Sequence, residues 1–460
     1  MAEIAAVDRI ISNRLEESLA ELARLCAQPS VSASGQGIPE CAALVGEMLR
    51  QRGFTVQTIA TAGHPVVFGE RPGRSDRRLL LYNHYDVQPP EPLELWTTPP
   101  FEPTIRDGKM YARGVSDDKG HIASRLAAID ALLAAEGNLP CSVKWIIEGE
   151  EETSSANLAT FVHSHMDLLA ADGCLWEFGG VNEQGTPVQY AGLRGIVYVE
   201  LTVETGTLDA HSGLGGSIFP NAAWRLVWAL ATLKGPDERI LLPGFYDKVV
   251  PPTPLDLDLL ARLPDEAASM LERYGLTSFI KGLRGGPELT RESIFTPTCT
   301  ICGLTSGYQG PGSKTVLPAR ASAKMDFRLI PDMTPEDVLQ QLRAHLDAHG
   351  FADVRITDLG SEPPARTDPM DPFLQMVVRT AESVYGVPQL IVPMSGGSGP
   401  NHLFVRDLGI PVATVGVGHP GNQVHAPNEN LVIDNFVNGV RHTARVLREF
   451  AAMGHSAAVA

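Results

Sequence analysis

Two hydrophobic periods alternate along residues 1–192 of the chain. Apolar residues recur three and four positions apart in some stretches, which predicts amphipathic helices at 4–27, 39–52, 119–135 and 156–165. Short apolar runs between these stretches predict buried strands at 55–61, 65–69, 79–82, 142–147 and 174–176. Strands that alternate with helices are typical of an α/β fold with a mostly parallel sheet.

The pattern changes after Gly192, where the alternating strand GIVYVELTVE begins. It is followed by a predicted helix in FPNAAWRLVWALATLK, a long strand in TVLPARASAKMDFRLIP, a helix in TPEDVLQQLRAHLDAHG and a strand in ADVRITDLG. Thr334 is a typical cap and Pro335 a typical first residue for the second of these helices. This order predicts a small α+β domain of ferredoxin-like type over 193–365, inserted into an α/β domain formed by 1–192 and 366–460.

The composition narrows the class of protein. Hydrophobic residues make up 43% of the 460 residues and charged residues 20%, as in ordinary globular proteins. The formal net charge of -17 argues against nucleic acid and anionic membranes as partners. No run of 18 apolar residues is present and charges occur throughout the first predicted helix, so we expect no membrane span and no signal peptide. The six scattered cysteines are typical of reduced thiols, and we therefore expect a cytoplasmic protein.

Metal-binding residue types gather just after the predicted strands. His84 and Asp86 end the strand in LLLYNHYD, and side chains two apart on a strand point the same way. Asp117 and Asp118 follow the strand-like KMYARG, and Glu177 follows the apolar run CLW. The strand VKWII is followed by an acidic cluster, Glu148, Glu150, Glu151 and Glu152.

His425, in the loop GNQVHAPNEN after the strand PVATVGVG, completes this set. Ligands bind at the carboxyl ends of strands in sheets of this kind. Clustered carboxylates raise one another's pKa by repulsion, and a shared cation removes that repulsion. Mixed histidine and carboxylate ligands suit Zn²⁺, with Mn²⁺ or Co²⁺ as alternatives. Two metal ions that share one carboxylate and have two further ligands each need five side chains, and five segments of the chain offer candidates.

The segments HYD, ARGVSDDKG, EGEEETSS, LWE, DAHSG, TVLP with FRLIP, GGSGP and HAPNEN, in this order, resemble the motifs of the aminoacylase–carnosinase family of di-zinc metallohydrolases. The sequence is most similar to the dipeptidase and carnosinase branch, and the resemblance spans nearly the whole chain. It implies a catalytic zinc-peptidase domain of α/β class with an inserted lid and dimerisation domain, and a homodimer. The implied reaction is cleavage of an amide or peptide bond in a small substrate with a free carboxylate, most of all a dipeptide.

The resemblance implies how two Zn²⁺ ions would be held. Asp117 matches the ligand that bridges the two ions. His84 and Glu177 match the remaining ligands of one ion, and Glu152 and His425 those of the other. Dipeptidase members of the family often have Asp at the position of Glu177.

Other acidic residues near these ligands take different roles by the same resemblance. Glu151 matches the general base, and Asp86 matches the carboxylate that holds the imidazole of His84. Asp118 is interpreted as a loop residue, and Asp172 as a weaker substitute for Glu177. The acidic residues interpreted as not catalytic are Glu148 and Glu150.

The inserted domain carries residues that the resemblance connects with the substrate. His211, in LDAHSGLGG, would reach the neighbouring subunit's active site and stabilise the oxyanion there. Arg328, in DFRLIP, would bind the substrate carboxylate, which a planar guanidinium suits. Thr315 and Asn221 are expected to line the same pocket as Arg328. The segment SGGSGP would add contacts from its backbone and from a side chain, at Gly397 and Ser398.

Alternatives to the dipeptidase remain at this point. Ser395 stands where some dipeptidase relatives have a Glu that contacts the substrate amino group. An N-acyl-amino-acid amidohydrolase (deacylase) or a glutamate-type carboxypeptidase with the same metal site is therefore the first alternative. A non-catalytic binding protein that retains the fold is the second, and it predicts a broken ligand set, whereas every ligand position is filled here.

Overall fold

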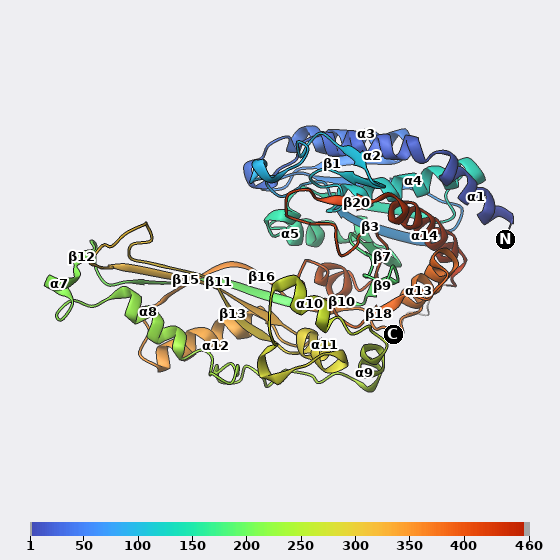
Figure 1. Cartoon of the computed structure of the whole chain (residues 1–460). Coiled ribbons are helices and arrows are strands. Elements are labelled where there is room, and N and C mark those ends of the chain that lie inside the picture. Colours follow the sequence, from blue (N-terminus) through green and yellow to red (C-terminus); the bar gives the residue numbers. More distant parts are fainter. Residues whose placement is uncertain (1, 455–460) are drawn as a thin grey trace. The chain divides into compact units, whose positions relative to one another are not determined.

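The computed structural model describes residues 2–454, and the chain forms two compact units (Figure 1). Within the described residues, unit 1 comprises the chain up to residue 192, residues 366–393 and the chain from residue 403 onward. Unit 2 comprises residues 193–365 and 394–402. The short second stretch belongs to unit 2 although unit 1 flanks it on both sides in the sequence.

Unit 1 is built on a six-stranded sheet with the order β1-β2-β6-β3-β7-β19. Its strands are β1 (Thr55–Ile59), β2 (Val66–Arg71), β3 (Arg78–His84), β6 (Ser142–Glu148), β7 (Gly173–Trp176) and β19 (Val412–Thr414). β6, β3, β7 and β19 run parallel, whereas β1 and β2 are antiparallel additions at one edge. The predicted fold class, α/β with a mostly parallel central sheet, is confirmed.

Most helices of unit 1 share one large hydrophobic core with this sheet. The helices that contribute to this core are α1 (Ala2–Asn13), α2 (Leu15–Ala27), α3 (Ile38–Gln51), α4 (Lys119–Glu136), α13 (Pro372–Tyr385) and α14 (Ile433–Ala452), and unit 1 also contains the short helices α5 (Leu158–Ser164) and α6 (Met166–Leu169). The single helix predicted over 4–27 is two helices, interrupted at Arg14. No helix within residues 2–454 is both long enough and apolar enough to span a membrane.

Two small sheets accompany the central sheet of unit 1. One has the order β20-β5-β4, with β20 (Asn430–Val432), β5 (Lys109–Tyr111) and β4 (Thr104–Arg106). The other has the order β18-β9-β8, with β18 (Leu390–Val392), β9 (Pro187–Tyr190) and β8 (Gly180–Val181). The first of them brings the segment after His425 beside the segment before Asp117.

Unit 2 contains a four-stranded antiparallel sheet with the order β13-β15-β11-β16. Its strands are β11 (Gly195–Glu204), β13 (Thr298–Ser306), β15 (Arg320–Leu329) and β16 (Arg355–Glu362). α8 (Ala222–Ala231) and α12 (Pro335–Ala348) pack on this sheet over a second hydrophobic core. The chain order β11-α8-β13-β15-α12-β16 is the predicted ferredoxin-like arrangement.

Smaller elements complete unit 2. They are β12 (Ala210–His211), α7 (Ser212–Gly215), α9 (Pro254–Ala261), α10 (Ala267–Tyr274), α11 (Gly286–Phe295) and β14 (Val316–Leu317). β10 (Gly192–Leu193) and β17 (Ala365–Arg366) pair where the chain enters and leaves the unit. The long strand predicted across Pro318 is two strands, β14 and β15, because proline has no N–H to donate to a strand ladder.

A buried histidine should make the stability of unit 1 depend on pH. Nε2 of His442, on α14, lies 3.0 Å from the carbonyl oxygen of Val377 and 3.1 Å from Oγ1 of Thr380, both on α13. Burial lowers the pKa of His442 to about 4. His442 takes up a proton near pH 6.5 in the unfolded chain but only near pH 4 in the folded chain. The stability that the neutral imidazole contributes is therefore complete above pH 6.5 and is lost as the pH falls toward 4.

We therefore expect the titration of His442 to lower the free energy of unfolding by about 3 kcal/mol when the pH falls from 7 to 4. Urea unfolding of the wild type and of His442→Gln at both pH values measures this contribution. The variant should lose about 3 kcal/mol less than the wild type over this interval. Equal losses in the two proteins would exclude His442 as a source of the pH dependence.

Candidate metal centre and active site

The candidate ligands meet at the carboxyl ends of the central strands of unit 1. β3 ends at His84, which is in register with Glu148 at the end of the parallel strand β6. Glu177 directly follows β7, the other parallel neighbour of β3. Because parallel strands end at the same edge of a sheet, segments far apart in the sequence reach one place, as predicted.

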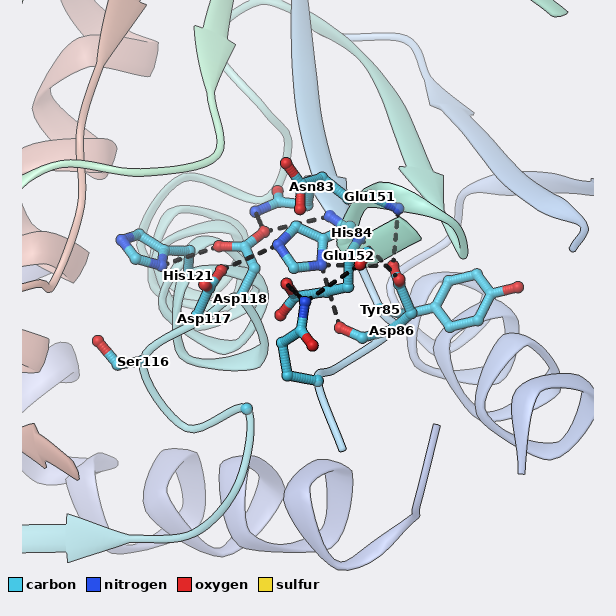
Figure 2. Close-up of polar contacts among 12 residues, drawn as sticks. Asn83, His84, Tyr85, Asp86, Ser116, Asp117, Asp118, His121, Glu151 and Glu152 are labelled. Carbon is cyan, nitrogen blue, oxygen red and sulfur yellow. Dashed lines mark hydrogen bonds and ion pairs between the residues drawn. The ribbon is translucent and has the colours of Figure 1, made fainter. Parts of the chain in front are cut away.

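Asp117 lies between the two histidines of the site, and Figure 2 shows its contact with His84. Its Oδ1 is 3.0 Å from Nε2 of His84, and its Oδ2 is 3.0 Å from Nε2 of His425. Nε2 of His425 is also 3.0 Å from Oε2 of Glu152. Ligand atoms of His84, Asp117 and Glu152 all lie within 4.8 Å of one another. A carboxylate between two histidines is chemically suited to binding cations.

Asp86 fixes the direction of His84 and the turn that carries the acidic cluster (Figure 2). Its carbonyl oxygen lies 3.0 Å from Nδ1 of His84, and its Oδ1 lies 3.4 Å from the same nitrogen. Its carboxylate also accepts the backbone N–H groups of Glu151 at 3.2 Å and Glu152 at 3.0 Å. With Nδ1 held in this way, Nε2 of His84 is directed to Asp117 and is free to bind a metal.

Asp118 lies in a turn, in agreement with its interpretation as a loop residue, but it also has a structural role. It is buried directly before α4, and its Oδ2 accepts the backbone N–H of His84 at 3.2 Å and a hydrogen bond from Nδ2 of Asn83. Its Oδ1 lies 2.8 Å from Nδ1 of His121 (Figure 2). Asp118 therefore anchors the end of β3 to the turn before α4. The sequence could not indicate this role, because its partners come from another strand and from the next helical turn.

Glu177 shows that the site suits a cation. Its side chain is buried, and its Oε2 has no hydrogen-bond partner among the described residues. A buried polar atom without a partner is unfavourable, and a metal ion would satisfy it. Glu177 also forms a group with His84 and Asp118 whose ligand atoms lie within 4.8 Å of one another. Asp172, the weaker candidate, lies before β7 at the opposite end and accepts the N–H of Arg78, so it is excluded.

The pKa values of the two histidines reflect the negative charge that surrounds them. Hydrogen bonds with Asp117 and Glu152 raise the pKa of His425 to about 10. Burial opposes the charged form of His84, but its hydrogen bonds with Asp117 and Asp86 raise its pKa well above the usual range. Metal ions would therefore displace protons from these histidines on binding.

The surroundings of Glu151 favour its protonated form. Burial raises the pKa of Glu151 well above its usual range, and the neighbouring carboxylates of Asp117 and Glu152 add to that effect. A carboxylate with a raised pKa can take up and hold a proton near neutral pH.

Arg125 is a residue of this site that sequence reasoning missed. It is fully buried on α4, and its guanidinium donates to the carbonyl oxygen of Tyr82 at 2.7 Å, to Oδ1 of Asn83 and to the carbonyl oxygen of Trp176. Asn83 precedes His84 and Trp176 precedes Glu177. One cation therefore ties together the ends of β3 and β7. A lone arginine among the apolar residues of IASRLAAI is the only sequence signal for it.

Three of the predicted substrate contacts lie together in unit 2. Nη1 of Arg328 donates to Oγ of Ser398 at 2.9 Å, and this hydroxyl donates to the carbonyl oxygen of Gly195 at 3.1 Å. The carbonyl oxygen of Gly397 accepts the backbone N–H of Arg194 at 3.0 Å. The segment 394–402 is thus held against the start of β11 and the end of β15.

The other three lie at the opposite end of the same sheet. Nε2 of His211, on β12, is 3.5 Å from Oγ1 of Thr315, and Asn221 caps the N-terminus of α8. β12 pairs with β14, which precedes β15 in the chain; Arg320 is the first residue of β15, whereas Arg328 is near its end. Eight steps along the strand lead from residue 320 to residue 328, which corresponds to more than about 25 Å. The expectation that Thr315 and Asn221 line one pocket with Arg328 is therefore wrong within a single chain.

Comparisons with known proteins agree with this fold. The family model described as Peptidase family M20/M25/M40 matches residues 80–449. An M20 family metallo-carboxypeptidase, Sso-CP2 from Sulfolobus solfataricus, is 35% identical, with a TM-score of 0.91 over 95% of this chain and 100% of that chain. The di-peptidase Dug1p from Saccharomyces cerevisiae is 25% identical, with a TM-score of 0.86 over 98% of this chain and 100% of that chain. The Cys-Gly metallodipeptidase dug1 from Schizosaccharomyces pombe is 27% identical over 96% of this chain and 98% of its own length.

Proposed function

This chain belongs to peptidase family M20/M25/M40 and is a metal-dependent peptidase, and we propose that it hydrolyses dipeptides at a two-metal site. The observation that carries the proposal is the cluster at the carboxyl ends of β3 and β7, where Asp117 lies between His84 and His425 with Glu151 in the same turn as Glu152. Relatives named Cys-Gly metallodipeptidase and Beta-Ala-His dipeptidase support the substrate class.

Zn²⁺ is the metal that these donors suit best, with Mn²⁺ or Co²⁺ as alternatives. Asp117 would be shared by both ions, His84 and Glu177 would bind one ion, and Glu152 and His425 would bind the other. When bound, the ions would polarise the scissile carbonyl and lower the pKa of the attacking water. The buried oxygen of Glu177 that has no hydrogen-bond partner supports this assignment.

The protein's own residues divide the remaining chemistry. Glu151 takes a proton from the attacking water and later delivers it to the leaving amine, so that the residue returns to its initial state. Asp86 keeps His84 directed toward the site. His211 would donate a hydrogen bond to the oxyanion, and Arg328 would bind the substrate carboxylate through its guanidinium.

A carboxypeptidase that accepts longer peptides is the second candidate. The metallo-carboxypeptidase Sso-CP2 is more similar to this chain in sequence than the di-peptidase Dug1p is. Both reactions use a free carboxylate at the end of the substrate, which Arg328 suits. They differ in whether the enzyme recognises a free amino group next to the scissile bond, and the neutral side chain of Ser395 supplies no charge for it.

A substrate panel separates these functions. We expect a free dipeptide such as Cys-Gly to be hydrolysed at least about tenfold faster than its N-acetylated form or a longer peptide with the same C-terminus. Initial rates are measured after addition of Zn²⁺, Mn²⁺ or Co²⁺. Equal or faster cleavage of the acetylated substrate would show that the enzyme is a deacylase, and equal or faster cleavage of the longer peptide would show that it is a carboxypeptidase.

We further propose that the active enzyme is a homodimer joined through unit 2. The separation of His211 from Arg328 along β15 supports a second copy, because one chain cannot offer both residues to one substrate. Trp224 and Trp228 of α8 are stacked and 57% and 55% exposed, which is unusual for a monomer surface. β13, at the edge of the sheet, also exposes large apolar side chains, Ile301 and Leu304.

Replacement of both tryptophans by Glu should convert the dimer into a monomer and lower kcat by about 10²–10³-fold, because an oxyanion donor from the other chain is lost. Light scattering during gel filtration gives the mass. The control is Met166→Glu, which charges an exposed apolar residue of unit 1. A fully active monomer would exclude the role of His211 in a neighbouring chain, and an unchanged dimer would exclude this surface.

A further inference from the structure

The site depends on two residues that belong to neither a helix nor a strand. Asp117 lies in the turn before α4, and His425 lies in the loop between β19 and β20. His425 has a left-handed backbone, with φ of 62°. A residue other than glycine is unfavourable in this conformation and keeps it only where the surroundings hold it. The loops around Asp117 and His425 therefore need a support of their own.

Glu429 organises the turn that ends at Asp117. Its side chain is buried, its Oε1 accepts the backbone N–H groups of Ser116 at 2.9 Å and Asp117 at 3.0 Å, and its Oε2 accepts the N–H of Gly114 at 2.9 Å. Nη1 of Arg113 donates to the same Oε2 at 2.8 Å. These hydrogen bonds occupy the four acceptor positions of one carboxylate.

The same residue closes the loop that carries His425. The carbonyl oxygen of Glu429 accepts the N–H of Ala112 at 3.2 Å, at the point where β20 pairs with β5. Arg113 also donates to the carbonyl oxygen of Ala426, next to His425, at 3.5 Å. Glu429 therefore holds one loop with its side chain and the other with its backbone and its ion-pair partner.

We propose that Glu429 is a positioning residue that sets the placement of Asp117 relative to His425 and so determines the affinity of the metal site. The proposal rests on the two-metal function proposed above. Glu429 has no contact with the metals or the substrate in this role and acts through the two ligands. The competing explanation is a buried ion pair of Glu429 and Arg113 that contributes to stability alone.

Glu429→Gln tests the proposal. The amide keeps the size of the side chain, but it replaces an acceptor oxygen with an NH₂ donor that faces the N–H groups of the turn. We expect Zn²⁺ affinity, measured by competition with a chromophoric chelator, to fall by about 10–100-fold. The absorption spectrum of the Co²⁺-loaded protein, which reports ligand geometry, should change as well. Glu21→Gln is the matched control, because it removes the charge of a part-buried ion-pair partner of Arg52 elsewhere in unit 1.

The double variant Arg113→Met with Glu429→Gln separates the positioning of the metal ligands from the contribution of the ion pair to stability. It removes both charges, so its thermal stability should move back toward that of the wild type, while its Zn²⁺ affinity stays low. The positioning role is overturned if Glu429→Gln has wild-type Zn²⁺ affinity and an unchanged Co²⁺ spectrum. It is also overturned if the double variant recovers affinity together with stability. Neither result would affect the proposed two-metal function. A wild-type protein that binds no metal would overturn the proposed function and this role with it.

Discussion

The Glu151→Gln variant should lose about 10²–10⁴-fold in kcat and keep its full metal content. Glutamine has the same shape as glutamate but cannot take a proton from the attacking water. Glu151 is not one of the proposed ligands, and the bond between its backbone N–H and Asp86 is unaffected by the substitution. Initial rates and bound metal per chain, measured on the same sample, test both parts of this expectation.

Glu150→Gln is the natural control, because Glu150 is adjacent in sequence and its Oε2 accepts a hydrogen bond from Nδ2 of Asn157 at 2.8 Å. This variant should retain nearly the wild-type rate. A wild-type rate in Glu151→Gln, or an equal loss in both variants, would show that Glu151 is not the general base.

Asp117→Asn should have the largest effect on metal binding. Its carboxylate is 3.0 Å from Nε2 of each of the two histidines, and an amide offers a single neutral oxygen in its place. Bound metal should fall from two ions per chain to less than one, and hydrolysis should be lost with it. Elemental analysis after dialysis against a metal buffer gives the stoichiometry.

Glu148→Gln controls for the removal of a buried acid in the same region. Burial raises the pKa of Glu148 to about 8, so this side chain is already neutral at pH 7 and glutamine resembles it closely. Tyr82 and Ser155 donate to it, and it is not a proposed ligand. Loss of metal from Glu148→Gln, or its retention in Asp117→Asn, would contradict the assignment of Asp117 as the shared ligand.

The sequence predicted the parts of the fold and of the site that depend on local periodicity. Buried parallel strands appear as continuous apolar runs, and the polar residue at the end of each run marks the ligand edge of the sheet. His84 and Glu177 lie at that edge for this reason. The order of motifs along the chain predicted the family, which the family match over residues 80–449 confirms.

The parts that depend on long-range pairing could not be predicted in the same way. Asp118, Arg125 and Glu429 take their roles from partners on other strands and loops, and no spacing along the chain indicates those partners. The helices α9, α10 and α11 lie in a region of weak periodicity rich in proline and glycine. The separation of His211 from Arg328 follows from the length of β15 and from the pairing of β12 with β14, and the sequence did not indicate that pairing.

The central claim is that hydrolysis depends on two metal ions held by Asp117, the two histidines and their neighbouring glutamates. Its most direct test is titration of the chelator-treated protein with Zn²⁺, with bound metal and the rate of dipeptide hydrolysis recorded at each step. Activity should be absent at the start and should rise to its maximum as binding approaches two ions per chain. Full activity in the metal-free protein, or maximal activity with saturation at one ion per chain, would contradict the claim.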